Sequence, residues 1–220
     1  MSDVLEMYKN QMAILPVDEY GDTPILLVWA WGIGSSLAVC LAKMWLKNIT
    51  VCDFDEVELH NVASQFYRMD DIGKLKVDAL KEIVLEQSWV EINTISEPFD
   101  ETMVQPYQYE VVIPCVDNND IRKQVVDTCD TVPVIIDARM TGYWFEWCQF
   151  SFINRDRYFD EFRYPQSEVT ATICSEKATA FNCFNIAGTV WALVRARLVD
   201  EDNVDIPFTL THDFRNFMFS

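Results

Sequence analysis

Residues 25–58 read ILLVWAWGIGSSLAVCLAKMWLKNITVCDFDEVE, and this stretch decides the fold. Its first four residues form an apolar run that is typical of a buried strand. A glycine turn at Gly32–Gly34 follows, and the apolar spacing from Ser35 to Leu46 then indicates a helix. Asn48 to Cys52 indicates a second buried strand, which ends in a run of acidic residues.

The order of these elements predicts a nucleotide-binding unit: a strand, a glycine turn, a helix, a second strand and an acidic residue. Glycines let the backbone approach a phosphate, and the helix N-terminus offers free N–H groups. An acidic residue after the second strand binds ribose hydroxyls, and Asp53 follows Gly34 at about the spacing of 20 residues that such units show. Two glycines alone are a weak signal, because a plain structural turn is more common.

The rest of the chain continues the alternation of strands and helices. We expect helices at 75–86 and 120–129, and strands at 90–95, 110–116 and 132–136. This rhythm predicts an α/β fold with a Rossmann-like, twisted, mainly parallel sheet and helices on both of its faces.

The pattern changes near residue 143. The aromatic stretch 143–152 is β-prone and predicts a strand in an antiparallel C-terminal extension of the sheet. Residues 155–175 are polar and predict an irregular crossover loop, and 179–199 predict a long, largely buried helix. We expect one domain over residues 1–220, with a nucleotide-binding part at about 24–142 and a mixed part at about 143–220.

From Val28 to Lys76 the sequence resembles the ThiF/MoeB and ubiquitin-activating adenylation domains. Their pattern is a glycine-rich turn, D-x-D-x-V-x-x-x-N, a glutamine and D-I-G-x-x-K. The matching residues, in order, are Asp53, Asp55, Val57, Asn61, Gln65, Asp71, Ile72, Gly73 and Lys76. Residues 115–118 with Arg122 are similar to the family's D-N-x-x-x-R segment, and 137–140 resemble the strand that follows it.

The resemblance implies roles for these residues. Nucleotide-binding roles fall to Gly32, Gly34, Asp53, Asp55, Asn61, Gln65, Arg68 and Lys76, with Asp53 at the ribose and Asn61 and Lys76 at the phosphates. Asp117 would hold Mg²⁺ and, with Lys76, would be catalytic. The implied reaction is ATP-dependent adenylation of the C-terminal glycine of a ubiquitin-like or sulfur-carrier protein.

The sequence departs from the family's pattern at the turn itself. The family has G-x-G-G-x-G, whereas residues 29–34 read WAWGIG. Trp29 and Trp31 therefore stand where small residues let a phosphate approach, and we expect them to obstruct or reshape the nucleotide pocket.

Two further positions bear on the chemistry. Ser64 replaces an arginine that the family often has, and Arg68 is the candidate substitute. Cys174 lies where relatives carry a conserved or reactive cysteine, although a buried structural cysteine is the more common outcome. No C-x-x-C pair is present, so we expect no structural zinc.

Three functions remain open at this stage. The chain is an active adenylating enzyme, or it is a ThiF-like binding module whose nucleotide site is blocked by Trp29 and Trp31. An NAD-dependent oxidoreductase ranks below both, because such enzymes share the turn and the acid but not Asn61, Gln65 and Lys76.

The composition of the chain limits which partners and which compartment we expect for it. The net charge is −18, and so acidic a surface repels phosphate backbones, which argues against nucleic-acid binding. Seven cysteines, mostly in apolar runs, fit reduced thiols in the cytoplasm. No apolar run approaches the roughly 18 residues of a membrane span. The family resemblance and the many aromatic residues lead us to expect a homodimer.

Overall fold

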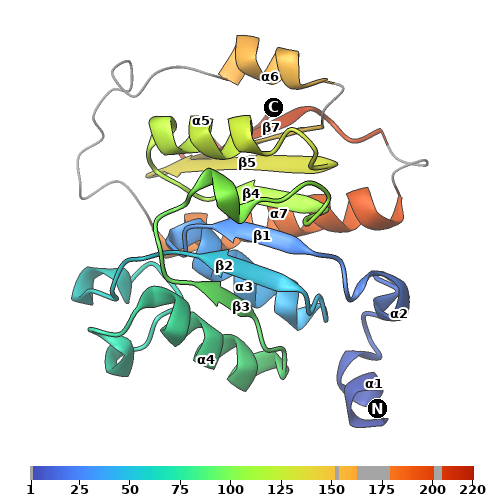
Figure 1. Cartoon of the computed structure of the whole chain (residues 1–220), viewed down its shortest axis with the longest axis vertical. Helices are drawn as coiled ribbons and strands as arrows, with labels where there is room; N and C mark the ends of the chain where they lie inside the picture. Colours follow the sequence, from blue (N-terminus) through green and yellow to red (C-terminus); the bar gives the residue numbers. More distant parts are fainter. Residues whose placement is uncertain (1, 152–153, 163–178, 201–204) are drawn as a thin grey trace.

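The computed structural model describes residues 2–151, 154–162, 179–200 and 205–220 of the chain. Its centre is an eight-stranded sheet in the order β3-β2-β1-β4-β5-β6-β7-β8, with helices on both faces (Figure 1). The predicted α/β class is therefore confirmed.

The first half of the sheet is parallel. Its strands are β1 (Ile25–Val28), β2 (Ile49–Cys52), β3 (Asn93–Ile95), β4 (Val111–Pro114) and β5 (Val134–Thr141). β1 lies between β2 and β4, with Val28 in register with both Cys52 and Pro114. The carboxyl ends of these three strands thus meet at one edge, where open α/β sheets bind their ligands.

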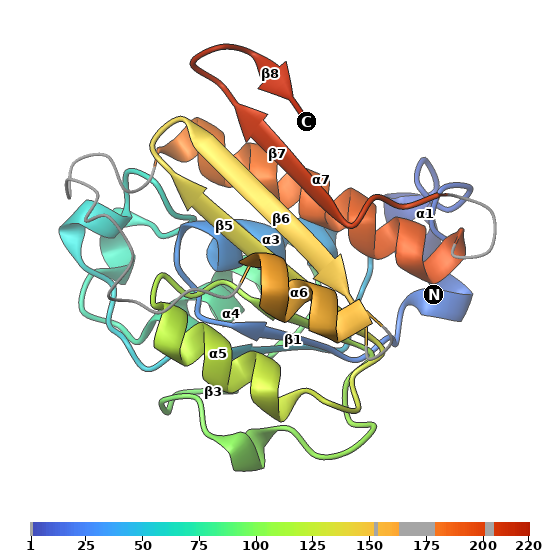
Figure 2. The same ribbon diagram turned by 90° about the horizontal axis from the view of Figure 1, so that it is seen from above.

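The helices divide between the two faces of the sheet. On one face are α3 (Gly32–Lys43), α4 (Lys76–Ser88) and α7 (Ala180–Val199), and on the other are α5 (Asn119–Thr128) and α6 (Arg155–Phe162) (Figure 2). β1 packs against the helices on both faces of the sheet, because successive residues of a strand point to opposite faces. Ile25 and Leu27 pack toward α3, α4 and α7, and Leu26 and Val28 pack toward α5 and α6.

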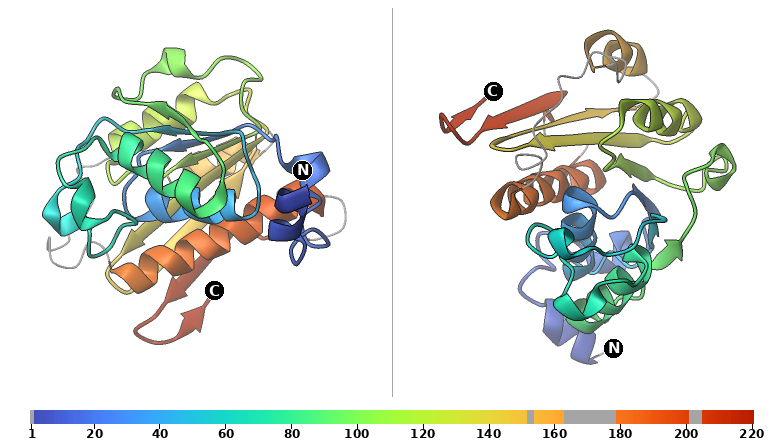
Figure 3. Two further views of the ribbon diagram at one scale, coloured as in Figure 1. Left: turned by 90° about the horizontal axis from the view of Figure 1, so that it is seen from below. Right: turned by 90° about the vertical axis from the view of Figure 1, so that its left-hand side faces the viewer.

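The second half of the sheet is antiparallel, as predicted. β6 (Trp144–Phe150) pairs with β5, β7 (Thr209–Asp213) pairs with β6, and β8 (Met218–Phe219) pairs with β7. Figure 3 shows these strands extending the sheet beyond its parallel half. We did not predict β7 and β8, since a short polar run such as THD carries little strand signal.

The N-terminal segment forms α1 (Ser2–Tyr8) and α2 (Val17–Tyr20), and the loops carry the short 3₁₀ turns η1 (Leu59–Asn61), η2 (Met69–Asp71) and η3 (Glu101–Met103). The buried Tyr8 hydroxyl donates a hydrogen bond of 2.7 Å to the Ser88 carbonyl, which fastens α1 to the end of α4.

One sequence prediction is wrong. The sequence predicts an irregular crossover loop over residues 155–175, but Arg155–Phe162 form α6, and residues 163–175 lie outside the described part of the chain. Tyr158 supplies the reason, because it is buried and stacks on Phe150 of β6 at 4.1 Å between ring centroids. This tertiary contact outweighs the polar composition.

Within the described part of the chain, no helix is long and apolar enough to cross a membrane. The single-domain organisation stays a prediction.

Candidate nucleotide-binding site

The turn between β1 and α3 is tightly wound. A Cβ atom added to Gly34 would lie 1.9 Å from the carbonyl oxygen of Trp29, so only glycine fits there. α3 begins at Gly32, and the residue before it, Trp31, makes no side-chain cap. The first N–H groups of α3 therefore have no side-chain cap at the carboxyl edge of β1, as an anion-binding helix terminus requires.

Trp29 adopts an unusual backbone conformation in this turn. Its φ is 77°, in the left-handed region that glycine adopts freely. For a bulky residue this conformation costs about 1–2 kcal/mol. The indole packs against the apolar cluster on the α5 side of the sheet.

Asp53 joins the turn to the end of β2. Its buried carboxylate accepts hydrogen bonds from the N–H of Ala30 at 2.7 Å and from the N–H of Asp55 at 2.8 Å. Burial raises the pKa of Asp53, and the Lys76 charge and the two N–H groups oppose this rise. Asp53, the acid predicted to bind the ribose, thus also joins the turn after β1 to the loop after β2.

Tyr67 fixes the same turn from the other side. Its hydroxyl is buried and donates a hydrogen bond of 2.6 Å to the carbonyl of Ala30. Sequence reasoning missed this residue. Nothing in its local sequence distinguishes it from an ordinary loop aromatic, because its role depends on a contact 37 residues away.

Lys76 is the first residue of α4, and its side chain is only 2% exposed. Its ammonium group lies 2.8 Å from a carboxylate oxygen of Asp55, and its backbone N–H donates to the Asp55 carbonyl, also at 2.8 Å. The Trp31 ring lies beside it, with 5.7 Å between the ammonium and the ring centroid. A buried cation thus stands next to the glycine turn, with an indole adjacent to it.

Asn61 and Gln65 lie in the loop between β2 and α4. Both are buried, and Asn61 uses its side-chain oxygen to accept the N–H of Glu58 at 2.8 Å. The side-chain oxygen of Gln65 has no hydrogen-bond partner among the described residues. An unmet buried acceptor is costly, so this atom is suited to receive a hydrogen bond from a ligand or a water.

Asp117 is exposed just beyond β4, at the same edge of the sheet. Arg122 on α5 holds the residues that precede Asp117. Its buried guanidinium donates hydrogen bonds to the carbonyls of Pro114 and Val116. Arg122 also forms a buried ion pair with Asp137 of β5. Arg122 therefore positions the loop that presents Asp117.

The Asp137 carboxylate is the centre of a buried polar cluster. It accepts from Arg122, from Arg139 at 2.8 Å and from the Tyr158 hydroxyl at 3.0 Å. Burial opposes ionisation of this carboxyl, but the two guanidinium groups and the hydroxyl outweigh it and lower the pKa of Asp137. The carboxylate thus stays charged and holds β5, α5 and α6 together.

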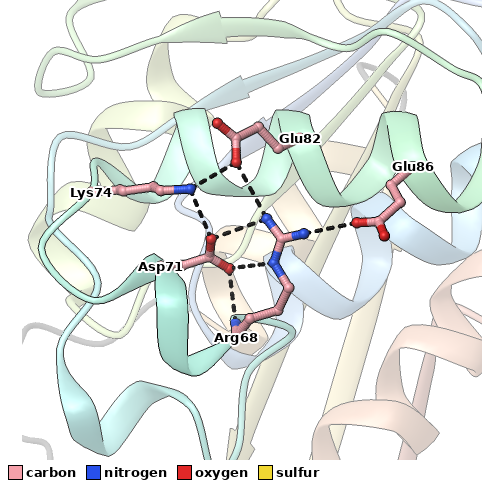
Figure 4. Close-up of polar contacts among 5 residues, drawn as sticks. All are labelled: Arg68, Asp71, Lys74, Glu82 and Glu86. Carbon is pink, nitrogen blue, oxygen red and sulfur yellow. Dashed lines mark hydrogen bonds and ion pairs between the residues drawn. The ribbon is translucent and has the colours of Figure 1, made fainter.

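Arg68 is engaged away from the glycine turn. Its guanidinium donates to Asp71 at 3.0 Å, to Glu86 at 2.7 Å and to Glu82 at 3.3 Å, and Lys74 joins the same network (Figure 4). These ion pairs tie η2 to the outer side of α4. In this arrangement Arg68 holds the loop that leads to Lys76.

The structure brings most of the predicted site residues to one edge of the sheet. Those around the turn and the ends of β2 and β4 are Gly32, Gly34, Asp53, Asp55, Lys76 and Asp117. Cys174 lies outside the described residues. In the described part of the chain, no three His, Cys, Asp or Glu side chains gather into a group that could hold a metal ion.

Known proteins with the same pattern identify the family. A sequence profile of the ThiF family matches residues 8–216. The chain belongs to the ThiF family. The molybdopterin-synthase adenylyltransferase of Haemophilus influenzae is 32% identical over 149 residues, which cover 61% of this chain and 61% of that relative.

Solved structures of the same fold agree. Escherichia coli TcdA, a tRNA N6-threonylcarbamoyladenosine dehydratase solved with ATP, superposes with a TM-score of 0.71 at 14% identity, covering 90% of this ThiF-family chain and 95% of its own. E. coli MccB, solved with AMPCPP and MccA, gives 0.71 at 15% identity, covering 92% and 64%.

Replacing Asp137 with Asn should destabilise the fold strongly. The change leaves two buried guanidinium groups without their counter-charge, which costs about 3–5 kcal/mol. Urea unfolding at pH 7 measures the loss, with Asp160→Asn on the exposed side of α6 as the matched control. A loss below about 1 kcal/mol would show that the cluster is not a structural centre.

Replacing Asp71 with Asn should destabilise the protein by about 1–3 kcal/mol at pH 7, because it removes a buried acceptor of charged hydrogen bonds. Burial disfavours the Asp71 carboxylate, but the Arg68 and Lys74 hydrogen bonds outweigh it and lower its pKa. A lowered pKa contributes stability above the unfolded value near 4 and loses it as the pH falls toward the folded value.

The stability difference between the parent and Asp71→Asn should therefore be constant above about pH 5 and shrink below about pH 4. Urea unfolding across this range measures it. The exposed neighbour Asp70→Asn is the control and should give no such pH dependence. A difference that grows in acid would contradict the assignment.

Proposed function

We propose that this ThiF-family chain has the site of an ATP-dependent adenylating enzyme that acts on the C-terminal glycine of a ubiquitin-like or sulfur-carrier protein. One observation carries the proposal. The buried Lys76, the carboxylate of Asp53 and the N-terminus of α3 converge at the carboxyl edge of β1 and β2, and Asp117 stands exposed beyond the neighbouring strand.

The arrangement suits attack by a carboxylate on the α-phosphorus of ATP. The carboxylate oxygen forms a bond to phosphorus, the bond to the bridging oxygen breaks, and pyrophosphate leaves with the electron pair. The step needs charge neutralisation and alignment more than proton transfer. Lys76 and the N–H groups of α3 supply positive charge, and Asp53 is placed for the ribose.

Relatives support this class of substrate. The matched H. influenzae protein is named for adenylyl transfer to molybdopterin synthase, and MccB was solved with a nucleotide analogue together with MccA. A homodimer, expected from the family resemblance, stays a prediction.

Asp117 fits the role of a magnesium ligand. Mg²⁺ in nucleotide sites is held by one or two protein carboxylates together with the substrate phosphates, so a single exposed carboxylate at this edge is a suitable donor. Asp53 suits this role less well, because both of its oxygens already accept backbone N–H groups.

A second function follows from the indoles. The Trp31 ring stands 5.7 Å from the Lys76 ammonium, so it lies close to any phosphate that binds Lys76. Trp29 and Trp31 therefore weaken nucleotide binding in this proposal. If they abolish it in the functional protein, the chain is a binding module that keeps the fold for partner contacts.

Isothermal calorimetry should show weak ATP binding by the chain as it stands and clear binding by Trp29→Gly/Trp31→Gly. In that double variant, Lys76→Ala should weaken binding about 10- to 100-fold, since a hydrogen bond to a charged group is lost. Lys81→Ala, on the same helix and paired with Glu91 beyond the other end of it, is the control. Low-micromolar binding by the parent chain, or no gain in the double variant, contradicts the role of the indoles.

In the variant that binds ATP, Asp117→Asn should reduce ATP–pyrophosphate exchange by about 10²-fold or more, because a charge fixed at the reacting phosphates is lost. The residue is exposed, so the thermal midpoint should not change. Asp120→Asn removes the same charge three residues further on and should leave exchange intact. Equal exchange rates in both variants would move the metal role to another residue.

A further inference from the structure

Three of the seven tryptophans adopt a backbone conformation that belongs to glycine. Trp29, Trp45 and Trp89 have φ angles of 77°, 64° and 61°, in the left-handed region. Bulky residues are genuine outliers there, because the Cβ atom crowds the following carbonyl. No other tryptophan in the described part of the chain has a positive φ.

Trp45 stands in the glycine position of a helix-ending motif. Its N–H donates to the Ala42 carbonyl at 2.9 Å, and the N–H of Leu46 donates to the Leu41 carbonyl at 3.2 Å. This pair of bonds is the Schellman motif that ends α3, and its outer residues, Leu41 and Leu46, are both buried in one apolar cluster. Glycine is the usual residue at the left-handed position of that motif, since it has no Cβ.

Trp89 ends α4 in the αL motif, which has one hydrogen bond where the Schellman motif has two. A single bond of 2.9 Å runs from its N–H to the Leu85 carbonyl, and the side chain points largely into solvent, with 57% of its surface exposed. An exposed indole gains little from packing, so nothing there compensates for the conformation. Trp29 is the third case, because it stands at the first glycine position of the turn whose remaining geometry is intact.

The composition points the same way. The chain has 6 glycines in 220 residues, whereas average usage of about 7% would give roughly 15. Tyr107 and Phe217 also have positive φ, but both lie in exposed loop segments and end no helix. Trp31, with a φ of −80°, is outside the inference.

We propose that positions 29, 45 and 89 are glycine in the protein made by its own organism, because the codon at these positions is decoded there as glycine. UGA is such a codon, since some genetic codes read it as tryptophan and others as glycine. The inference rests on the backbone and not on the proposed function, so either can fail without the other.

Stability provides the first test. At each position the glycine variant is compared with the alanine variant, so that the lost indole contacts cancel. Glycine should be more stable than alanine at positions 45 and 89, raising the thermal midpoint by roughly 2–4 °C. Trp191 within α7 and Trp144 within β6 are the controls, and there alanine should be more stable than glycine.

Decoding provides the second test. The codons at 29, 45 and 89 should be UGA, whereas those at 144, 147 and 191 should be UGG. Peptide mass spectrometry of the protein from its own organism should find glycine at the first three positions and tryptophan at the last three. Tryptophan at 29, 45 and 89 in that protein overturns the proposal, and so does alanine being as stable as glycine at 45 and 89.

Discussion

The site depends on one carboxylate that joins two loops. Asp53 follows β2, yet its oxygens accept N–H groups from Ala30 in the β1 turn and from Asp55 in its own loop. Tyr67 donates to the carbonyl of Ala30, which belongs to the next peptide group along the chain. The two peptide groups that flank Ala30, just before α3, are thus each held by a side chain. Because the N-terminus of α3 follows directly, the direction of its free N–H groups is set by these contacts.

A second buried carboxylate organises the other half of the sheet. Asp137 lies between Arg122 and Arg139 and accepts hydrogen bonds from both. Arg122 also donates to the carbonyl just before Asp117, so it links this cluster to that loop. Buried charges are costly unless they are paired and hydrogen-bonded, and the Asp137 carboxylate is both paired with two guanidinium groups and hydrogen-bonded to them and to Tyr158. The exposed Asp117 therefore follows residues whose carbonyls are held by Arg122.

The sequence predicts the parallel half of the fold well and the antiparallel half less well. Short apolar runs such as Ile25–Val28 are buried on both faces, so their composition alone indicates strands. α6 and β7 are polar, and their structure comes from tertiary contacts such as the stacking of Tyr158 on Phe150. The site follows the same division. A linear motif predicts Asp53 and Lys76 as site residues, whereas Tyr67 acts across the chain and leaves no local pattern. Arg68 is predicted only as a substitute for the arginine missing at position 64, and its acidic partners on α4 could not be paired with it from sequence.

In the proposed site, a phosphate would take the place of Asp55 beside Lys76. The ammonium is buried, but its partner Asp55 keeps 44% of its side chain exposed, so the carboxylate can return to water when an anion replaces it. Such an exchange would keep a negative group beside the buried ammonium. A phosphate would also need room, and the Trp31 ring lies 5.7 Å from the ammonium. Glycine at position 31 would open this space without altering any of the hydrogen bonds that fix Asp53 and Ala30, since none of them involves the indole.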